Sequence, residues 1–186
     1  MIWFTSDTHF GHEKIIHLAK RPFKSVEEMD EVIIQLWNQR VKPGDIIYHL
    51  GDFALKQTRE QTLATLKRLK GQVHLITGNH EDNALAVAPH FADVKPYKAI
   101  KVGDQKIVLF HYPIRSWDGI FKGAWHLYGH VHGMLKGFGK SMDVGVDTND
   151  FYIYSFDEVK EKMDATPRLT EEEGFPGYVE LSERFK

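Results

Sequence analysis

The stretch Asp45-Ile46-Ile47-Tyr48-His49-Leu50-Gly51-Asp52 predicts a buried strand that ends by presenting a carboxylate. Its apolar run is short and follows a Lys42-Pro43-Gly44 turn, which favours a central parallel strand over a helix. Gly51 allows the backbone to turn sharply after the strand. Ligands of open α/β sheets bind at the carboxyl ends of the strands, so Asp52 is a candidate for chemistry, although an Asp in this position is more often a cap.

Four other strand-like runs end in the same way. The side chains that follow them are Asp7 and His9 after residues 2–5, Asn79 and His80 after residues 73–77, His111 after residues 107–110, and His130 and His132 after residues 125–128. All of them offer oxygen or nitrogen donors of the kind that bind divalent metals. Five such strand ends are improbable as turn chemistry alone, which indicates a metal site.

The composition limits what such a site can belong to. The 186 residues, 42% of them hydrophobic, are sufficient for one globular domain with a sizeable core. The chain has no cysteine, which excludes disulfides, thiolate metal sites and thiol catalysis. A net charge of −2 argues against a protein that binds long nucleic acids through a basic surface. Small phosphate compounds remain possible substrates.

The sequence also bears on location. No basic leader precedes the first strand, and no apolar stretch approaches the ~20 residues that a membrane span needs. We therefore expect a cytoplasmic protein with no membrane partner. The sequence does not indicate an oligomeric state.

Strand and helix patterns alternate along the chain, which predicts an α/β fold. Helices are expected over residues 12–20, from Ser25 to the Pro43-Gly44 break, and from Thr58 to Gly71, the last two with capping boxes at their starts. Residues 99–102 and 105–111 predict a hairpin that begins a second sheet. Further strands over residues 141–146 and 152–155 and a short helix from Ser155 are expected to follow.

No repeat or linker divides the chain. We expect a single domain over residues 1–164, followed by a charged C-terminal extension over residues 165–186 that contains Glu171-Glu172-Glu173. The segment from Tyr112 to Gly123 lacks periodicity and is rich in aromatic and charged residues. It suits either a loop over a pocket or an ordinary surface loop.

The motifs resemble, in their order, those of calcineurin-like metallophosphoesterases, and they cover residues 5–132. They are Asp7-x-His9, Gly51-Asp52, Gly78-Asn79-His80-Glu81, His111 and Gly129-His130-x-His132. The resemblance implies an α/β fold in which a two-layer β-sandwich is flanked by helices, with a dinuclear metal centre at the strand ends. It implies that one metal is held by Asp7, His9, Asp52 and His132, and the second by Asp52, Asn79, His111 and His130. Asp52 would then bridge the two metals.

Such a centre suits phosphate chemistry. Two divalent ions attract a phosphate, activate water near neutral pH and stabilise the charge of the transition state. Because all ligands are oxygen or nitrogen atoms, we expect manganese, with iron, nickel or zinc as alternatives.

Three further residues are candidates for the reaction. His80 follows a ligand without being one in the family pattern, and we expect it to protonate the leaving group. Arg115 is a candidate phosphate clamp because a guanidinium can bind two oxygens at once, and His12 is a candidate substrate contact. The family often continues Gly-Asp-x-x-Asp, with the last Asp orienting the catalytic histidine, but this chain has Leu55 there. Glu81, Asp82 or a metal-bound water would have to orient His80 instead, or His80 acts without an orienting carboxylate.

These observations predict a dinuclear metal-dependent phosphoesterase that hydrolyses a small phosphodiester or nucleotide-like substrate. One alternative is a nuclease that acts on DNA or RNA, although no stable nucleic-acid complex is expected. The other is a non-catalytic scaffold with this fold.

Overall fold

The protein contains two β-sheets. The computed structural model describes residues 1–170 and 173. The first sheet has the order β4-β3-β2-β1-β9 and is formed by β1 (Ile2–Thr5), β2 (Ile46–His49), β3 (Gln72–Ile76), β4 (Asp93–Lys95) and β9 (Tyr154–Ser155). The second has the order β5-β6-β7-β8 and is formed by β5 (Tyr97–Val102), β6 (Gln105–Phe110), β7 (Trp125–Tyr128) and β8 (Ser141–Asp143).

The helices are α1 (Glu13–Leu18), α2 (Val26–Arg40), α3 (Arg59–Arg68), α4 (Asp82–Leu85) and α5 (Phe156–Ala165), with 3-10 turns η1 (Ala88–His90), η2 (Ile120–Lys122) and η3 (Val146–Thr148). The helices α2, α3 and α5 begin at the capping residues that the sequence predicts, Ser25, Thr58 and Ser155. Thr58 and Ser155 form complete capping boxes. The box expected at Ser25 is half formed, because Glu28 accepts from Lys24 N instead of Ser25 N. Among the described helices, none is both long and apolar enough to cross a membrane.

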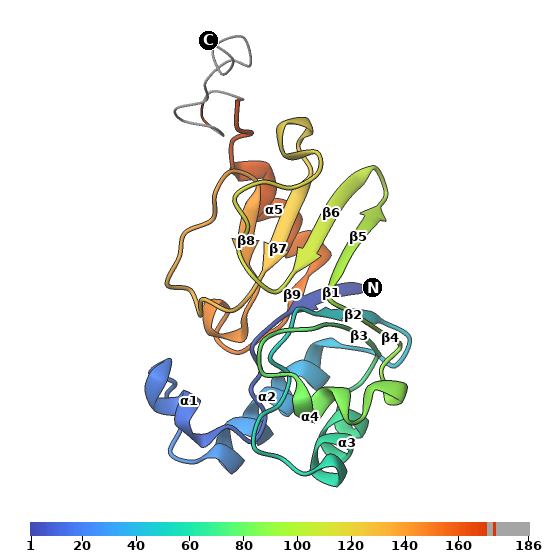
Figure 1. Ribbon diagram of the computed structural model, residues 1–186, viewed down its shortest axis with the longest axis vertical. Coiled ribbons are helices and arrows are strands. Elements are labelled where there is room, and N and C mark those ends of the chain that lie inside the picture. Colours follow the sequence, from blue (N-terminus) through green and yellow to red (C-terminus); the bar gives the residue numbers. More distant parts are fainter. Residues whose placement is uncertain (171–172, 174–186) are drawn as a thin grey trace, which may run out of the picture.

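The strands of the first sheet separate two cores. Trp3 and Ile47 pack in a core with buried side chains of α1 to α4, whereas Phe4 and Tyr48, the next residues along each strand, belong to a core shared with the second sheet and α5. Figure 1 shows α1 to α4 gathered on one side of the first sheet and the second sheet on the other. The predicted fold class, a two-sheet sandwich flanked by helices, is confirmed.

Parallel pairing brings the carboxyl ends of the central strands to one edge of the sandwich. Thr5 of β1 pairs with His49 of β2, which pairs with Leu75 of β3. In the second sheet, β6, β7 and β8 are also parallel. The edges of the two sheets meet where Val146 N donates to Ser6 O at 3.1 Å. The segments that follow five strands of the two sheets therefore converge.

Two predictions of strand bounds need adjustment. The strand expected over residues 141–146 ends at Asp143, because the Asp143 side chain accepts hydrogen bonds from Gly145 N and Gly133 N and turns the chain. The strand expected over residues 152–155 is reduced to β9, and it joins the first sheet antiparallel to β1. Ala165, the first residue of the predicted C-terminal extension, is the last residue of α5, and Glu171, Glu172 and residues 174–186 of that extension lie outside the described part of the chain.

Candidate metal centre

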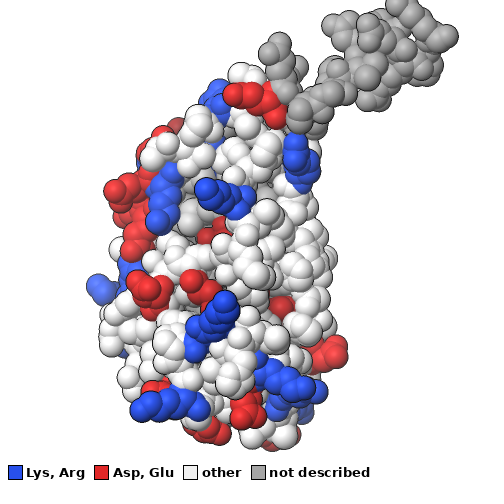
Figure 2. All heavy atoms as spheres, turned by 90° about the vertical axis from the view of Figure 1, so that its left-hand side faces the viewer, with Lys and Arg blue, Asp and Glu red and all other residues white. Residues whose placement is uncertain are grey.

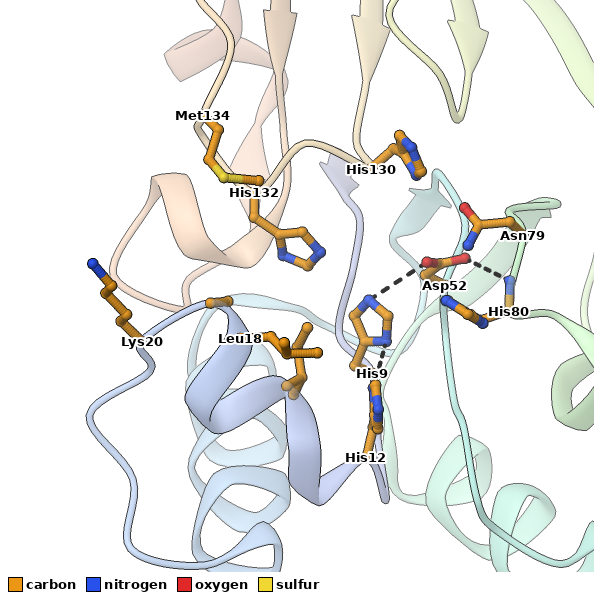
Figure 3. A pocket seen from close by; sticks show the side chains of 12 residues that line it. His9, His12, Leu18, Lys20, Asp52, Asn79, His80, His130, His132 and Met134 are labelled. Carbon is orange, nitrogen blue, oxygen red and sulfur yellow. Dashed lines mark hydrogen bonds and ion pairs between the residues drawn. The ribbon is translucent and has the colours of Figure 1, made fainter.

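All seven predicted metal ligands come from the segments that follow β1, β2, β3, β6 and β7. They are Asp7, His9, Asp52, Asn79, His111, His130 and His132. Asp7, His9, Asp52 and His111 are buried, whereas the side chains from the β3 and β7 segments are more open to solvent. Figure 3 shows His9, His132, His130 and Asn79 arranged around Asp52. The site thus has a buried acidic floor and an accessible rim of histidines.

The first ligand cluster contains buried polar atoms without partners. His9 Nε2 lies 3.5 Å from Asp52 Oδ2 and 3.9 Å from Asp7 Oδ1, and His132 Nε2 lies 3.9 Å from the same Asp7 oxygen. Neither Asp7 Oδ1 nor His9 Nε2 has a hydrogen-bond partner among the described residues. Burial raises the pKa of Asp7 to about 7 and lowers the pKa of His9 below its usual range. A divalent cation would satisfy these donor atoms, so the residues fit a metal.

The second ligand cluster lies on the other side of Asp52. His111 Nε2 is 3.6 Å from Asp52 Oδ1 and 3.1 Å from Asn79 Oδ1, and the rings of His111 and His130 are 5.1 Å apart. His111 Nδ1 donates to Leu50 O at 2.7 Å, which leaves Nε2 of the ring directed at Asn79 Oδ1. A divalent cation at this point would be bound by both atoms. This donor set also fits a divalent metal.

The two oxygens of Asp52 face different clusters. Oδ2 is directed toward His9 and Oδ1 toward His111. A carboxylate that bridges two metals needs this arrangement, which agrees with the predicted role of Asp52. That role itself remains a prediction.

Two residues that the motifs do not include orient the first cluster. Asp147 Oδ2 lies 2.7 Å from His132 Nδ1, which leaves Nε2 of that ring directed at Asp7. Arg21 is buried, pairs with both Asp147 oxygens at 2.8 Å, and donates to Asp7 O at 2.6 Å. Arg21 and Asp147 are 126 positions apart, and no spacing in the sequence connects them.

The backbone of the site is strained. Five of the ligand residues have positive φ angles, namely Asp7 at 57°, His9 at 51°, Asp52 at 56°, His130 at 71° and His132 at 47°. Residues other than glycine rarely adopt this conformation, and it clusters at functional sites where the surrounding fold enforces it. Gly129 allows the close approach of the β7 segment, because a Cβ there would collide with Ser6 Oγ and Asp7 Oδ2.

His80 lies at the rim of the site. Its backbone N–H donates to Asp52 Oδ1 at 2.9 Å, and its exposed ring lies 5.9 Å from the ring of His9 and 6.4 Å from that of His12. The Glu81 carboxylate accepts from the backbone N–H groups of Asp52, Phe53 and Gly78, so it clamps two loops together. Within the described chain, no carboxylate hydrogen-bonds to the His80 ring.

Comparison with known proteins agrees with this geometry. The calcineurin-like phosphoesterase superfamily domain matches residues 1–136. The chain belongs to this superfamily. An uncharacterized protein of Methanocaldococcus jannaschii is 32% identical over 164 residues, which cover 84% of this chain and 87% of that protein. The gene 66 protein of Mycobacterium phage D29 is 26% identical over 161 residues, covering 72% of this chain and 79% of the phage protein.

A solved structure shares the fold of this chain. The crystal structure of a protein of unknown function from Aquifex aeolicus superposes with a TM-score of 0.72 at 28% sequence identity, covering 87% of this chain and 98% of that one. The match of the superfamily domain to residues 1–136 confirms the family that the sequence motifs predict.

In this member of the superfamily, Arg115 is not among the residues that line the cavity at the predicted ligands. Its guanidinium packs 4.3 Å from the centre of the Phe138 ring, and the neighbouring Trp117 is buried on the outer face of the second sheet beside Val108. The segment over residues 112–123 is thus an aromatic-anchored loop, and Arg115 does not line the cavity at the metal centre. Its predicted role as a phosphate clamp gains no support from this position.

A cavity of about 490 Å³ opens over the predicted ligands. Its lining residues are His9, His12, Ile15, Leu18, Ala19, Lys20, Asp52, Asn79, His80, His130, His132 and Met134. His12, the predicted substrate contact, is one of these lining residues, and its Nδ1 lies 3.3 Å from His9 Nδ1. The cavity is large enough for a small phosphate ester.

Proposed function

We propose that the protein hydrolyses a small phosphodiester or nucleotide-like ester with two divalent metal ions bound at the strand ends. The observation that carries this proposal is the position of Asp52, whose two oxygens face separate clusters of Asp, His and Asn donors. Two divalent ions held there would activate water and stabilise the negative charge of the transition state. Manganese is the metal we propose first, because hard and borderline ligands make up both clusters.

The protein's own residues would then orient the metal ligands and protonate the leaving group. Asp147 and Leu50 O hold the Nδ1 protons of His132 and His111, so that both Nε2 atoms stay available as ligands. Asp52 Oδ1 anchors the backbone of His80, which keeps the imidazole beside the ligands and open to the cavity. From there an imidazole N–H would protonate the leaving oxygen of the ester.

A nuclease that acts on long DNA or RNA is the first alternative. The net charge is −2, and on the face shown in Figure 2 positive and negative side chains are interspersed instead of forming a basic stripe. Binding to long nucleic acid depends on many phosphate contacts and weakens steeply with salt. The charge distribution on this face therefore favours a small ester.

A non-catalytic scaffold is the second alternative. Five of the seven predicted ligands, namely His9, Asp52, Asn79, His130 and His132, line the same cavity as His80. A scaffold has no need of an accessible histidine beside such a set, so we favour an enzyme.

The test has two measurements. Elemental analysis of protein reloaded with manganese should approach two metals per chain, and saturation at one would contradict the dinuclear site. Hydrolysis should then be measured on a panel of phosphomonoesters, phosphodiesters, cyclic nucleotides and DNA, before and after treatment with a chelator. We expect metal-dependent turnover of a small diester. Turnover confined to DNA, with tight and salt-sensitive binding, would support the nuclease instead.

A further inference from the structure

The cavity at the metal centre has two chemically different sides. The predicted ligands and His80 form the polar side, whereas Ile15, Leu18 and Ala19 at the end of α1 and Met134 after β7 form an apolar one. Figure 3 shows Leu18 and Met134 on the opposite side of His9 from His80. Lys20 is the one charged residue among those that line the apolar side.

Two side chains of the apolar side are open to solvent. Leu18 is 73% exposed and Met134 is 82% exposed, and both line the cavity. They lie on separate segments of the chain, and a molecule that filled the cavity would cover both. Covering such groups is favourable in proportion to the apolar area removed from water.

The apolar side is held in place by the core. Ile15 and Ile16 of α1 are buried in the core that α1 to α4 share with the first sheet. The six-residue helix therefore presents Leu18 from a fixed base. Because α1 is already packed on the core, binding against Leu18 does not require this helix to be ordered first.

We propose that this apolar side binds a ring-like apolar group carried by the phosphoryl group of the substrate, so that the enzyme prefers aryl phosphate compounds to sugar phosphates. The hydroxyl groups of a sugar would lose water against Ile15, Leu18, Ala19 and Met134 without gaining hydrogen bonds from these side chains. A flat apolar group has no hydroxyl groups that would lose hydrogen bonds to water at this wall. This inference rests on the proposed function, because it assumes that the phosphate binds at the metal centre.

Binding of two small phosphonates tests the proposal without requiring turnover. Phenylphosphonate and methylphosphonate share the anionic group and differ in the apolar part. Calorimetric titration of the manganese-loaded protein should give a Kd for phenylphosphonate at least ~10-fold lower than that for methylphosphonate. The double variant Leu18→Ser/Met134→Ser should reduce this ratio to below ~3-fold while still binding methylphosphonate.

Leu135→Ser is the matched control. Leu135 is adjacent to Met134 and 52% exposed, but it does not line the cavity, so its loss should leave the ratio unchanged. Equal Kd values in the unmodified protein, or a preference for phenyl that survives the double variant, would overturn the proposal. A preference for phenylphosphonate without hydrolysis of any ester would uphold the apolar subsite and contradict the proposed activity. Hydrolysis without this preference would uphold the proposed activity and contradict the apolar subsite.

Discussion

The Asp147 carboxylate accepts a hydrogen bond of 2.7 Å from Nδ1 of His132. The same carboxylate is held by Arg21, which also donates to the backbone of Asp7. Two predicted ligands of one metal are thereby connected through a single buried ion pair. Burial raises the pKa of Asp147, but its contacts with His132 and Arg21 outweigh burial and lower this pKa. Burial lowers the pKa of His132, but the hydrogen bond to Asp147 outweighs burial and raises it.

Asp147→Asn should weaken one of the two metal sites. The amide keeps the shape of the carboxylate but loses its charge, so it holds neither the His132 proton nor Arg21 as firmly. Loss of such an orienting partner typically lowers metal affinity by ~10- to 100-fold. Manganese titration of the variant should show one weakened site and one unchanged site. Asp150→Asn, at an exposed position, is the control, and equal affinities in both variants would contradict the orienting role of Asp147.

Asp52→Asn should be the most damaging substitution of a ligand. Asp52 is the residue whose oxygens face both clusters, whereas His9 belongs to one of them. The Asn variant should therefore lose metal from both sites, and His9→Ala should lose it mainly from one. Metal content after gel filtration, measured by elemental analysis, distinguishes the two patterns. Wild-type metal content in Asp52→Asn would show that the bridge is assigned wrongly.

His80→Ala should slow hydrolysis while leaving the metal content intact. Among the described residues, His80 is hydrogen-bonded to Asp52 through its backbone N–H and not through its ring, and general acid catalysis contributes a factor of ~10²–10⁴. The loss in kcat should be smaller for a nitrophenyl ester than for an alkyl ester, because a nitrophenolate leaves without a proton. Equal losses on both esters would remove His80 from the role of acid.

Asp30→Asn should change how stability depends on pH. Asp30 accepts from Gly11 N at 3.0 and 3.2 Å, and burial raises its pKa from 3.8 to about 7. Between these values the folded protein holds a proton that the unfolded chain has released, so the contribution of Asp30 to the free energy of unfolding falls as pH rises, by up to ~1.4 kcal/mol per pH unit.

The Asn variant lacks this titration. Urea unfolding from pH 4 to pH 8 should show the variant gaining stability relative to the unmodified protein as pH rises toward 7, with no further gain above it. Parallel pH profiles for the two proteins would contradict the raised pKa of Asp30.

The sequence by itself was sufficient for the strands of the two sheets that carry the site and for the residues that follow them. The apolar runs before Asp7, Asp52 and His111 are short and local, and parallel strands place their carboxyl ends together whatever follows them. Capping residues such as Thr58 and Ser155 depend on contacts three residues away, which explains why those helix starts were predicted correctly.

Only the tertiary structure decided which groups support the site. Glu81 was a candidate partner of His80, but packing of the β2 and β3 segments directs it to three backbone N–H groups instead. Arg115 has a suitable guanidinium, yet its loop packs on the outer face of the second sheet. Arg21 and Asp147 meet across 126 positions because the two sheets close on each other. Contacts of this kind depend on how distant layers pack, and no short-range pattern in the sequence encodes them.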